Sequence, residues 1–256
     1  AQGDVTIIGS TVANNSAQGA YSHGAGIYSD GAVKATNSTF VGNRGYEYGT
    51  RGGAIYAGAD VTLTHVTITG NGVTNSANTG GGVYFKGAAS VENAIILGNN
   101  ASFGGGELDR NANTAAPADV TFTGQNIVGA TSRDFNTTGF TNVVNASAVS
   151  VFAQTGVFEE AFGILGDNGG PVQTVALLAD AANPALDATS TTGTDARGFA
   201  RADLAGVNNG GVADLGAFEA QTSDDSTPPV ITSNTAISLA EGLRSALSFT
   251  PVTAMD

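Results

Sequence analysis

The sequence has no cysteine and no tryptophan, and it carries few charged side chains. Without cysteine, neither a disulfide framework nor a thiolate metal site can form. Basic residues are especially scarce, since nine lysines and arginines stand against 22 aspartates and glutamates, for a net charge of −13. Nucleic acids and anionic membrane surfaces would be repelled, and both are excluded as partners, whereas calcium and neutral glycans are compatible with this charge.

Long apolar segments are also missing. No apolar run reaches the length of a membrane span, which predicts no membrane insertion within this chain. No signal peptide opens the sequence, so a secreted location would make the chain a fragment of a mature protein. No run shows the apolar spacing of an amphipathic helix. By contrast, 41% hydrophobic residues suffice to bury a core, and the 37 glycines predict many tight turns between short strands.

What the sequence has in abundance is an internal repeat. The motif at residues 24–28 (GAGIY) returns at 52–56 and at 80–84, 28 residues later each time (52 − 24 and 80 − 52). A second column of asparagines, each ending a short β-rich run, keeps the same step. Two independent columns at one period indicate stacked structural repeats. The asparagines are Asn15, Asn43, Asn71 and Asn99.

Each period holds about three strand-like runs between glycine or asparagine turns, and its β-branched and aromatic residues favour strands over helices. We therefore predict an all-β fold, a right-handed parallel β-helix with coils of about 28 residues, in which residues one period apart lie above each other. The alternative, an antiparallel sandwich or propeller, is disfavoured by the scarcity of hairpin signals. The predicted inward columns are Ile27, Ile55 and Val83, and Phe40, Ile68 and Ile96, beside an asparagine ladder.

Several motifs resemble a known group of proteins. Gly52-Gly53-Ala54-Ile55 and Phe40-Val41-Gly42-Asn43 are similar to the GGAI and FxxN signatures of polymorphic outer-membrane protein repeats. A later series closely resembles the C-terminal signature of choice-of-anchor Q domain proteins, which implies a β-helix on the surface of a bacterium, or secreted by it, but no established chemistry. That series comprises Leu165-Gly166-Asp167-Asn168-Gly169-Gly170-Pro171, Asn183-Pro184-Ala185-Leu186-Asp187, Asp195-Ala196-Arg197-Gly198-Phe199-Ala200-Arg201 and Asp214-Leu215-Gly216-Ala217-Phe218-Glu219.

The composition changes along the chain and suggests four segments. Residues 1–150 are predicted to form the coils, and residues 151–222 a C-terminal region that closes and caps the β-helix. Residues 223–229 read as a polar, proline-stiffened linker. Residues 230–256 resemble the opening strands of a bacterial cadherin-like module, a partial β-sandwich-like tail, so we expect the chain to be part of a longer tandem protein.

The cadherin-like resemblance implies a calcium role for two acids. Glu241 and Asp256 match two calcium-ligand positions of that family, although Gly242 stands where the family has asparagine. We expect any calcium effect to belong to this segment and to be weak, because the other ligands of the motif are missing.

Charged residues recur within the choice-of-anchor-like signature. Opposite charges on short strands predict a salt-bridged cap over the end of the β-helix, which would otherwise expose unpaired backbone groups. A calcium site is the alternative, because carboxylates suit that ion, but the arginines would satisfy the acids directly. The residues of the predicted cap are Asp187, Asp195, Arg197, Arg201, Asp214 and Glu219.

One aromatic cluster is a candidate ligand site. By register, the run Tyr46-Glu47-Tyr48 lies in a loop near Tyr21, His23 and Arg51. Planar aromatic side chains beside Glu and Arg suit stacking on sugar rings, so a glycan is the candidate ligand; the alternative is a loop that packs its own tyrosines. The second histidine, His65, is one and a half periods away from His23, which argues against a shared metal.

The pattern favours a structural or adhesive module of a large secreted protein, binding glycans or a second copy of itself. For self-association, strand-like residues 237–252 are a candidate donor to the first coil, which would extend head to tail. The alternative is a secreted polysaccharide-active enzyme, a lyase or hydrolase. It is disfavoured because the adjacent acids Glu159 and Glu160 would point in opposite directions on a strand and no convincing catalytic pair is present.

Overall fold

The computed structural model describes residues 1–75, 79–103, 105–110, 120–129, 140–207 and 209–221. The chain divides into two units, Ala1–Thr222 and Ser223–Asp256, and all described residues belong to the first. The predicted linker and the cadherin-like tail, with Glu241 and Asp256, therefore lie outside the described residues. Within the described part, regular structure is almost entirely β, with one short helix, α1 (Ala148–Val151).

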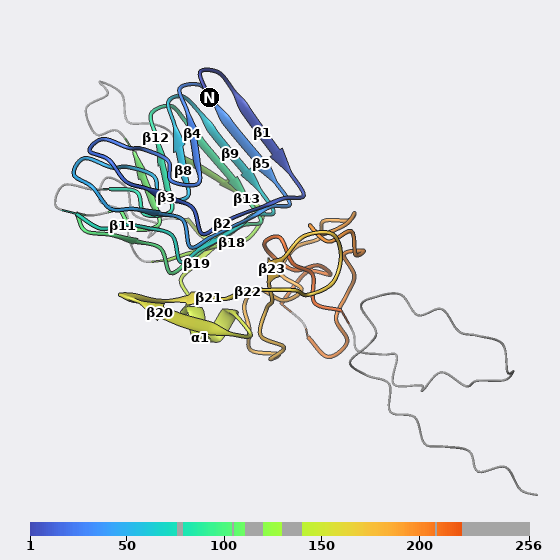
Figure 1. Cartoon of the computed structure of the whole chain (residues 1–256). Coiled ribbons are helices and arrows are strands. Elements are labelled where there is room, and N and C mark those ends of the chain that lie inside the picture. The colour runs from blue at the N-terminus through green and yellow to red at the C-terminus, as the bar shows by residue number, and fades with distance from the viewer. Residues whose placement is uncertain (76–78, 104, 111–119, 130–139, 208, 222–256) are drawn as a thin grey trace, which may run out of the picture. The chain divides into compact units, whose positions relative to one another are not determined.

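Parallel strands stack into a solenoid of about four coils, which confirms the predicted parallel β-helix fold (Figure 1). The first four coils each contribute one strand to each of four sheets, and each strand pairs with its equivalent in the next coil; three further strands extend the first two sheets. The first sheet consists of β1 (Val5–Ile8), β5 (Val33–Thr36), β9 (Val61–Thr64), β13 (Ala89–Glu92) and β17 (Val120–Thr123). The second consists of β2 (Thr11–Ala13), β6 (Thr39–Val41), β10 (Thr67–Thr69), β14 (Ile95–Ile96), β18 (Asn126–Val128) and β19 (Val143–Val144).

The remaining two sheets of the solenoid have fewer strands, and the sharp bends between successive sheets need special backbone geometry. At the corner between the first and second sheets, Asn37, His65 and Asn93 occupy equivalent positions with φ of 45°, 50° and 50°, so this column adopts the left-handed conformation. The third sheet consists of β3 (Ser16–Ala17), β7 (Arg44–Gly45), β11 (Gly72–Val73) and β15 (Asn100–Ala101). The fourth consists of β4 (Ile27–Ser29), β8 (Ile55–Ala57), β12 (Val83–Phe85) and β16 (Leu108–Arg110).

The interior is filled by apolar columns at the predicted register. Ile55 pairs with Ile27 on one side and with Val83 on the other, and all three pack into one core. Period-two alternation places these side chains inside while their strand neighbours face outward. The second predicted column behaves in the same way, since Phe40, Ile68 and Ile96 are paired in series and fully buried.

The predicted asparagine ladder runs along one corner of the coils. Each of Asn15, Asn43 and Asn71 donates from its side-chain amide to the Oδ1 of the next asparagine, at 2.8 Å each time. The same oxygen also accepts the backbone N–H of the preceding asparagine, at 3.0–3.2 Å. One amide thus satisfies groups on two coils, which is why the column repeats in every coil.

The ladder does not end on another asparagine. The coil step changes after the third repeat, since Val83 pairs with Leu108 whereas Ile95 pairs with Ile127. Glu107 takes the next place in the ladder: Nδ2 of Asn99 donates to its Oε2 at 2.6 Å. Burial raises the pKa of this carboxyl to about 8. A constant 28-residue period therefore does not describe the fourth coil.

The C-terminal segment corrects one prediction. It was expected over the end of the β-helix, but it lies along the outer face of the second sheet, beside β2, β18 and β19 (Figure 1). The hydroxyl of Thr11 donates to the backbone carbonyl of Gln173, and the hydroxyl oxygen of Thr67 accepts the backbone N–H of Ala217. The two threonines lie on different coils. The segment contains α1 and the antiparallel pairs β20 (Thr155–Phe158) with β21 (Glu160–Gly163) and β22 (Leu165–Gly166) with β23 (Thr174–Val175).

Packing explains this placement. In the later coils the second sheet presents apolar rather than hydroxyl side chains to the outside, and the C-terminal segment buries them in a second hydrophobic core. An exposed apolar strip on a sheet needs a cover, and the segment supplies it. This core contains Ile95, Leu97 and Ile127 from the sheet and Val151, Phe152, Val175, Leu177, Leu186 and Leu215 from the segment.

Candidate functional site

Two stacked loops carry every residue for which the sequence predicted a glycan-binding role. One loop joins β3 to β4 and the other joins β7 to β8, one coil further on. The loops are bonded to each other through their backbones: Tyr21 N–H donates to the carbonyl of Tyr48, and Gly24 N–H to that of Arg51, both at 2.9 Å. The structure thus brings together the six residues Tyr21, His23, Tyr46, Glu47, Tyr48 and Arg51, which we call the two-loop surface.

Three tyrosines of the two-loop surface are exposed. The exposed fractions of Tyr21, Tyr46 and Tyr48 are 65%, 40% and 50%. The rings of Tyr21 and Tyr48 meet edge to face, with centroids 5.9 Å apart and an interplanar angle of 89°. Tyr21 rests on Gly49, where a Cβ would come within 2.6 Å of the ring, so a larger residue would displace it. The pair is therefore held in place while still reaching solvent.

A column of tyrosines lies beside this surface on the fourth sheet. Tyr28, Tyr56 and Tyr84 stack through successive coils, with centroids 5.1 and 5.3 Å apart. His23 adds a fourth ring, stacked on Tyr56 at 4.7 Å. A tyrosine is the last residue of each copy of the repeated motif, so the sequence predicts that the three tyrosines stack. The repeat does not indicate what such a column binds or contacts. Tyr56 and Tyr84 are only 3% exposed, so other side chains cover them.

The covering groups include cations. Arg51 lies over the ring of Tyr84 at 5.1 Å, and the Nζ of Lys86 lies 5.5 Å from the ring centroid of Tyr56. Burial, together with the charges of Arg51 and Lys86, lowers the pKa of His23 to about 4, so this imidazole is neutral at physiological pH. The two-loop surface therefore continues into a basic, aromatic-backed strip on an otherwise acidic chain.

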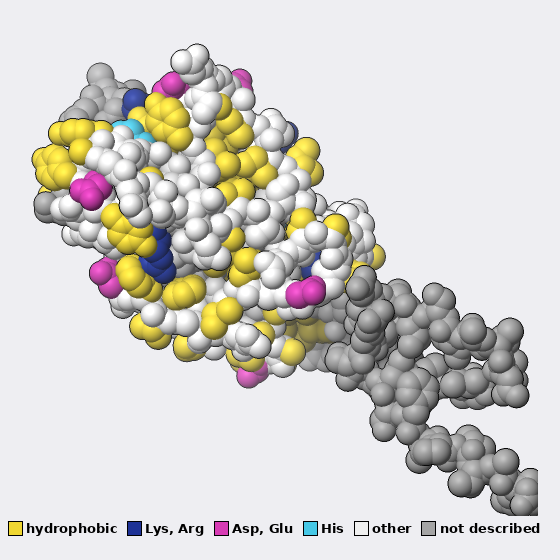
Figure 2. All heavy atoms as spheres, viewed as in Figure 1, with side chains coloured by type: hydrophobic (Ala, Val, Ile, Leu, Met, Phe, Trp, Pro, Cys, Tyr) yellow, Lys and Arg dark blue, Asp and Glu magenta, His cyan; other side chains and the backbone are white. Residues whose placement is uncertain are grey.

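Figure 2 shows how the kinds of side chain are distributed over one face of the molecule. Uncharged polar groups and backbone cover most of that face, hydrophobic side chains form several separate patches, and acidic side chains lie singly. No broad charged field extends over this face, in keeping with the low content of charged residues. Local aromatic and hydrogen-bonding groups, rather than long-range steering, are the recognition elements that such a surface offers.

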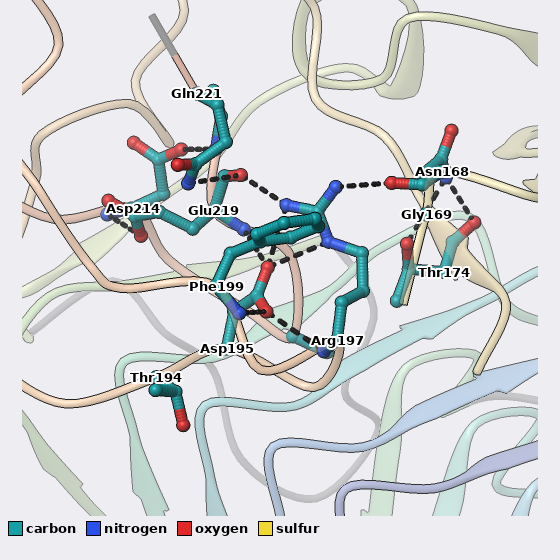
Figure 3. Close-up of polar contacts among 12 residues, drawn as sticks. Asn168, Gly169, Thr174, Thr194, Asp195, Arg197, Phe199, Asp214, Glu219 and Gln221 are labelled. Carbon is teal, nitrogen blue, oxygen red and sulfur yellow. Dashed lines mark hydrogen bonds and ion pairs between the residues drawn. The ribbon is translucent and has the colours of Figure 1, made fainter. Parts of the chain in front are cut away.

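Five charged residues of the signature form a buried ionic cluster: Asp195, Arg197, Arg201, Asp214 and Glu219. Figure 3 shows Asp195, Arg197, Asp214 and Glu219 side by side. Arg197 Nη2 lies 2.7 Å from Asp195 Oδ2, and Arg201 Nη1 lies 3.1 Å from Glu219 Oε2. The guanidinium of Arg197 is also stacked on the ring of Phe199, at 4.6 Å. Both pairs are shielded from water, and the Arg201–Glu219 pair joins two separate stretches of the segment, which is a structural arrangement.

The remaining oxygens of the cluster are also occupied. Asp214 accepts the backbone N–H groups of Asp187 and Ala220, at 2.9 and 2.6 Å. Burial raises the pKa of Asp214 to about 6, and burial with the nearby charge of Asp214 raises that of Glu219 to about 7. Among the described residues, no group of three or more histidines or acids is arranged to hold a metal ion. The geometry in this cluster fits a scaffold, not a calcium site.

The enzyme alternative depends on a suitable pair of acids. Glu107 and Glu160 both line a cleft of about 300 Å³ between the coils and the C-terminal segment. Both oxygens of Glu107 are engaged, however, by the Gly98 N–H at 2.8 Å and the amide of Asn99. Glu159 occupies the turn of the β20–β21 hairpin with φ of 61°, and Glu160 begins β21. The two glutamates were expected on one strand, and the structure corrects this. Glu107 thus anchors the ladder rather than presenting a reactive group.

A second groove, of about 590 Å³, opens between a corner of the coils and the C-terminal segment. Asn93 lies in it and donates to Thr191 Oγ1 at 3.0 Å, so its amide is committed to joining the two parts. Among the described residues, the groove lining contains Glu92 but no aromatic side chain. The aromatic two-loop surface is the stronger candidate for ligand binding.

Comparison with known proteins does not assign the chain to a family or a function. No family model matches the chain, and neither a curated protein nor a solved structure is significantly similar to it. The resemblance to choice-of-anchor Q and cadherin-like domains therefore stays a prediction. Among the described residues, no helix is long and apolar enough to cross a membrane.

Proposed function

We propose that this chain is a structural and adhesive module of a large secreted bacterial cell-surface protein, and that it binds glycans through the two-loop surface. The observation that carries the proposal is the exposed, fixed tyrosine pair of Tyr21 and Tyr48. Aromatic rings held at the surface offer flat apolar faces for the C–H faces of sugar rings, while neighbouring polar groups bind hydroxyls.

The scaffold supports this role. Loops from consecutive coils are bonded to each other at the spacing of a β-sheet, so residues on neighbouring loops form one continuous surface. Such a surface suits an extended, repeating polymer better than a small metabolite. A location at the bacterial surface or outside the cell, head-to-tail association with a second copy and weak calcium binding at Glu241 and Asp256 belong to the same proposal.

The glycan-binding role is tested by substitution. Wild-type protein is screened on a microarray of neutral and acidic oligosaccharides, and the strongest ligand is then titrated by calorimetry. We expect Tyr48→Ala to weaken binding about fivefold or more, because one wall of the aromatic pair is lost.

Val157→Ala serves as the matched control, since it removes an exposed apolar side chain on β20, outside the two-loop surface. Binding by this variant should equal that of the wild type. A microarray on which wild-type protein binds nothing, or a ligand that Tyr48→Ala binds as tightly as wild type does, contradicts the proposal.

A further inference from the structure

The strip beside the two-loop surface concentrates positive charge in an acidic chain. Nine basic residues are present in total, and Arg51 and Lys86 lie over adjacent rings of the tyrosine column. His23, from the first loop, stacks on Tyr56 of the same column, and the charges of Arg51 and Lys86 help to lower its pKa. Two cations gathered on one aromatic wall repel each other, so their proximity calls for a compensating partner.

Among the described residues, no acidic side chain forms an ion pair with Arg51 or Lys86. The pairs Arg197–Asp195 and Arg201–Glu219 lie in the buried ionic cluster, away from these two cations. Lys86 is exposed and Arg51 is partly exposed. Contact with an aromatic ring positions a cation but leaves its charge in place. Both groups are therefore ready to bind an external anion.

Nearby acids restrict the kind of anion. Asp30 accepts the hydroxyl hydrogen of Tyr28 at the first-coil end of the tyrosine column, and Glu47 lies in the same loop as Tyr46 and Tyr48. A densely charged polymer, such as a heavily sulfated glycan or a nucleic acid, would place negative groups against both acids. A chain with separated, single carboxylates can bind the cations and still avoid these acids.

Resting on the proposed function, we propose that the ligand is an acidic glycan that contains uronate residues. Its carboxylates bind Arg51 and Lys86, and its pyranose faces pack on Tyr21 and Tyr48. Carboxylate recognition by a guanidinium is a charge-assisted, directional contact, whereas the lysine contributes a point charge.

The test compares two probes that differ only in charge. Oligogalacturonate and the same oligosaccharide with its carboxyls reduced to alcohols are titrated into the full chain by calorimetry. We expect the wild type to bind oligogalacturonate about tenfold or more tightly than the reduced form. The double variant Arg51→Gln/Lys86→Gln should lose this preference, because it removes both cations. Added salt should weaken only the charged complex.

Lys34→Gln is the matched control, because it removes an exposed lysine from the outer face of the first sheet and should keep the full preference. Circular dichroism establishes that each variant is folded; if the double variant is not, Lys86→Gln alone at this exposed position must reduce the preference. Equal binding of both probes by the wild type, or a preference that survives these substitutions, overturns the inference and leaves glycan binding intact. Binding of neither probe nor any arrayed glycan overturns both proposals.

Discussion

A single buried amide in the asparagine ladder satisfies several groups at once. Asn71 donates to Asn99 at 2.8 Å and to the carbonyls of Phe40 and Thr69 at 3.0 Å, while its oxygen accepts from Asn43. It is 1% exposed, so no water replaces these partners when the amide is removed. Unsatisfied buried polar groups are costly, which makes the ladder a major determinant of coil stability.

We expect Asn71→Ala to lower the free energy of unfolding by about 3 kcal/mol or more, because it leaves buried hydrogen-bonding groups on two coils without a partner. Asn15→Ala provides the comparison, since that residue is exposed and its side chain bonds only to Asn43 in the ladder. Its cost should stay below about 1 kcal/mol. Chemical denaturation of both variants measures the difference, and similar values for the two would contradict this account.

The end of the ladder gives the protein a pH dependence. Burial raises the pKa of Glu107 to about 8, so the folded state binds a proton that the unfolded state releases between pH 4.5 and 8. Stability contributed by this group is therefore present at low pH and is lost as pH rises. Burial lowers the pKa of His23 and His65 to about 4 and 3, and these groups reduce stability only below pH 6.5.

The raised pKa values of Asp214 and Glu219, about 6 and about 7, add to the decline mainly below pH 7, so Glu107 is isolated by comparing the wild type with a variant. We expect Glu107 to account for about 1.5 kcal/mol of the fall in the wild-type free energy of unfolding between pH 6.5 and 8. In Glu107→Gln, which has no titrating carboxyl, this decline should be smaller by that amount, whatever the absolute stability of the variant. Urea denaturation at several pH values gives the slope, and parallel curves for the two proteins would rule out Glu107 as its source.

The sequence predicts the asparagines of the ladder but not Glu107 at its end, for a physical reason. Equivalent residues stack only while the coil length is constant, so the 28-residue step predicts Asn43, Asn71 and Asn99 directly. Where the step changes, sequence distance no longer specifies spatial neighbours. Glu107 enters the ladder from a loop only eight residues beyond Asn99, a position that no period marks.

At the scale of elements, the C-terminal segment is a cover for the second sheet. The order of charged motifs in the sequence correctly predicted that its acids and arginines would pair. It did not predict the location, because the apolar residues that the segment buries, such as Ile95 and Ile127, occupy outward positions where earlier coils have threonines. That switch is visible in the aligned repeats as Thr11, Thr39 and Thr67 followed by Ile95.

The ionic cluster should hold this cover in place. Arg201 binds Glu219, the carbonyls of Asp214 and Gly216, and Asn37 on the second coil, at 2.8–3.2 Å. Arg201→Ala leaves the Glu219 carboxylate buried without its cation, and we expect a loss of about 3 kcal/mol.

Limited proteolysis, with fragments identified by mass spectrometry, should then cut first within residues 151–221 while the coils persist. Lys34→Ala, on the exposed face of β5, should leave both stability and cleavage unchanged. Simultaneous loss of the coils and the segment in Arg201→Ala would show that the segment is not a separable cover.

For the molecule as a whole, stacking explains why its candidate site was accessible to sequence analysis. Tyr21 and Tyr48 lie 27 residues apart, about one coil, so the period placed them side by side before any coordinates. The role of Lys86 was missed because it acts across coils, over Tyr56 rather than over a residue of its own loop. A repeat fold thus reveals which columns touch, but not which side chains reach over to a neighbouring column.

The first coil ends the stack in the described part of the chain. Among the described residues, β1, β2 and β3 each pair with one neighbouring strand, and Ile8 on β1 is 67% exposed. Unpaired parallel strands are templates for a further strand. Residues 237–252, which lie outside the described part, were the predicted donor. Donation to a second copy would link molecules head to tail.

We expect the average mass from static light scattering to rise with concentration for the full chain and to stay at the monomer value for residues 1–222, which form a compact unit of their own. Ile8→Lys should also abolish the rise, because a charge on an edge strand opposes docking of another strand. Val157→Lys, which changes an even more exposed side chain on β20, should preserve it. If the full chain stays monomeric at high concentration, its open edge is not used for self-association, and the adhesive role then depends on glycan binding alone.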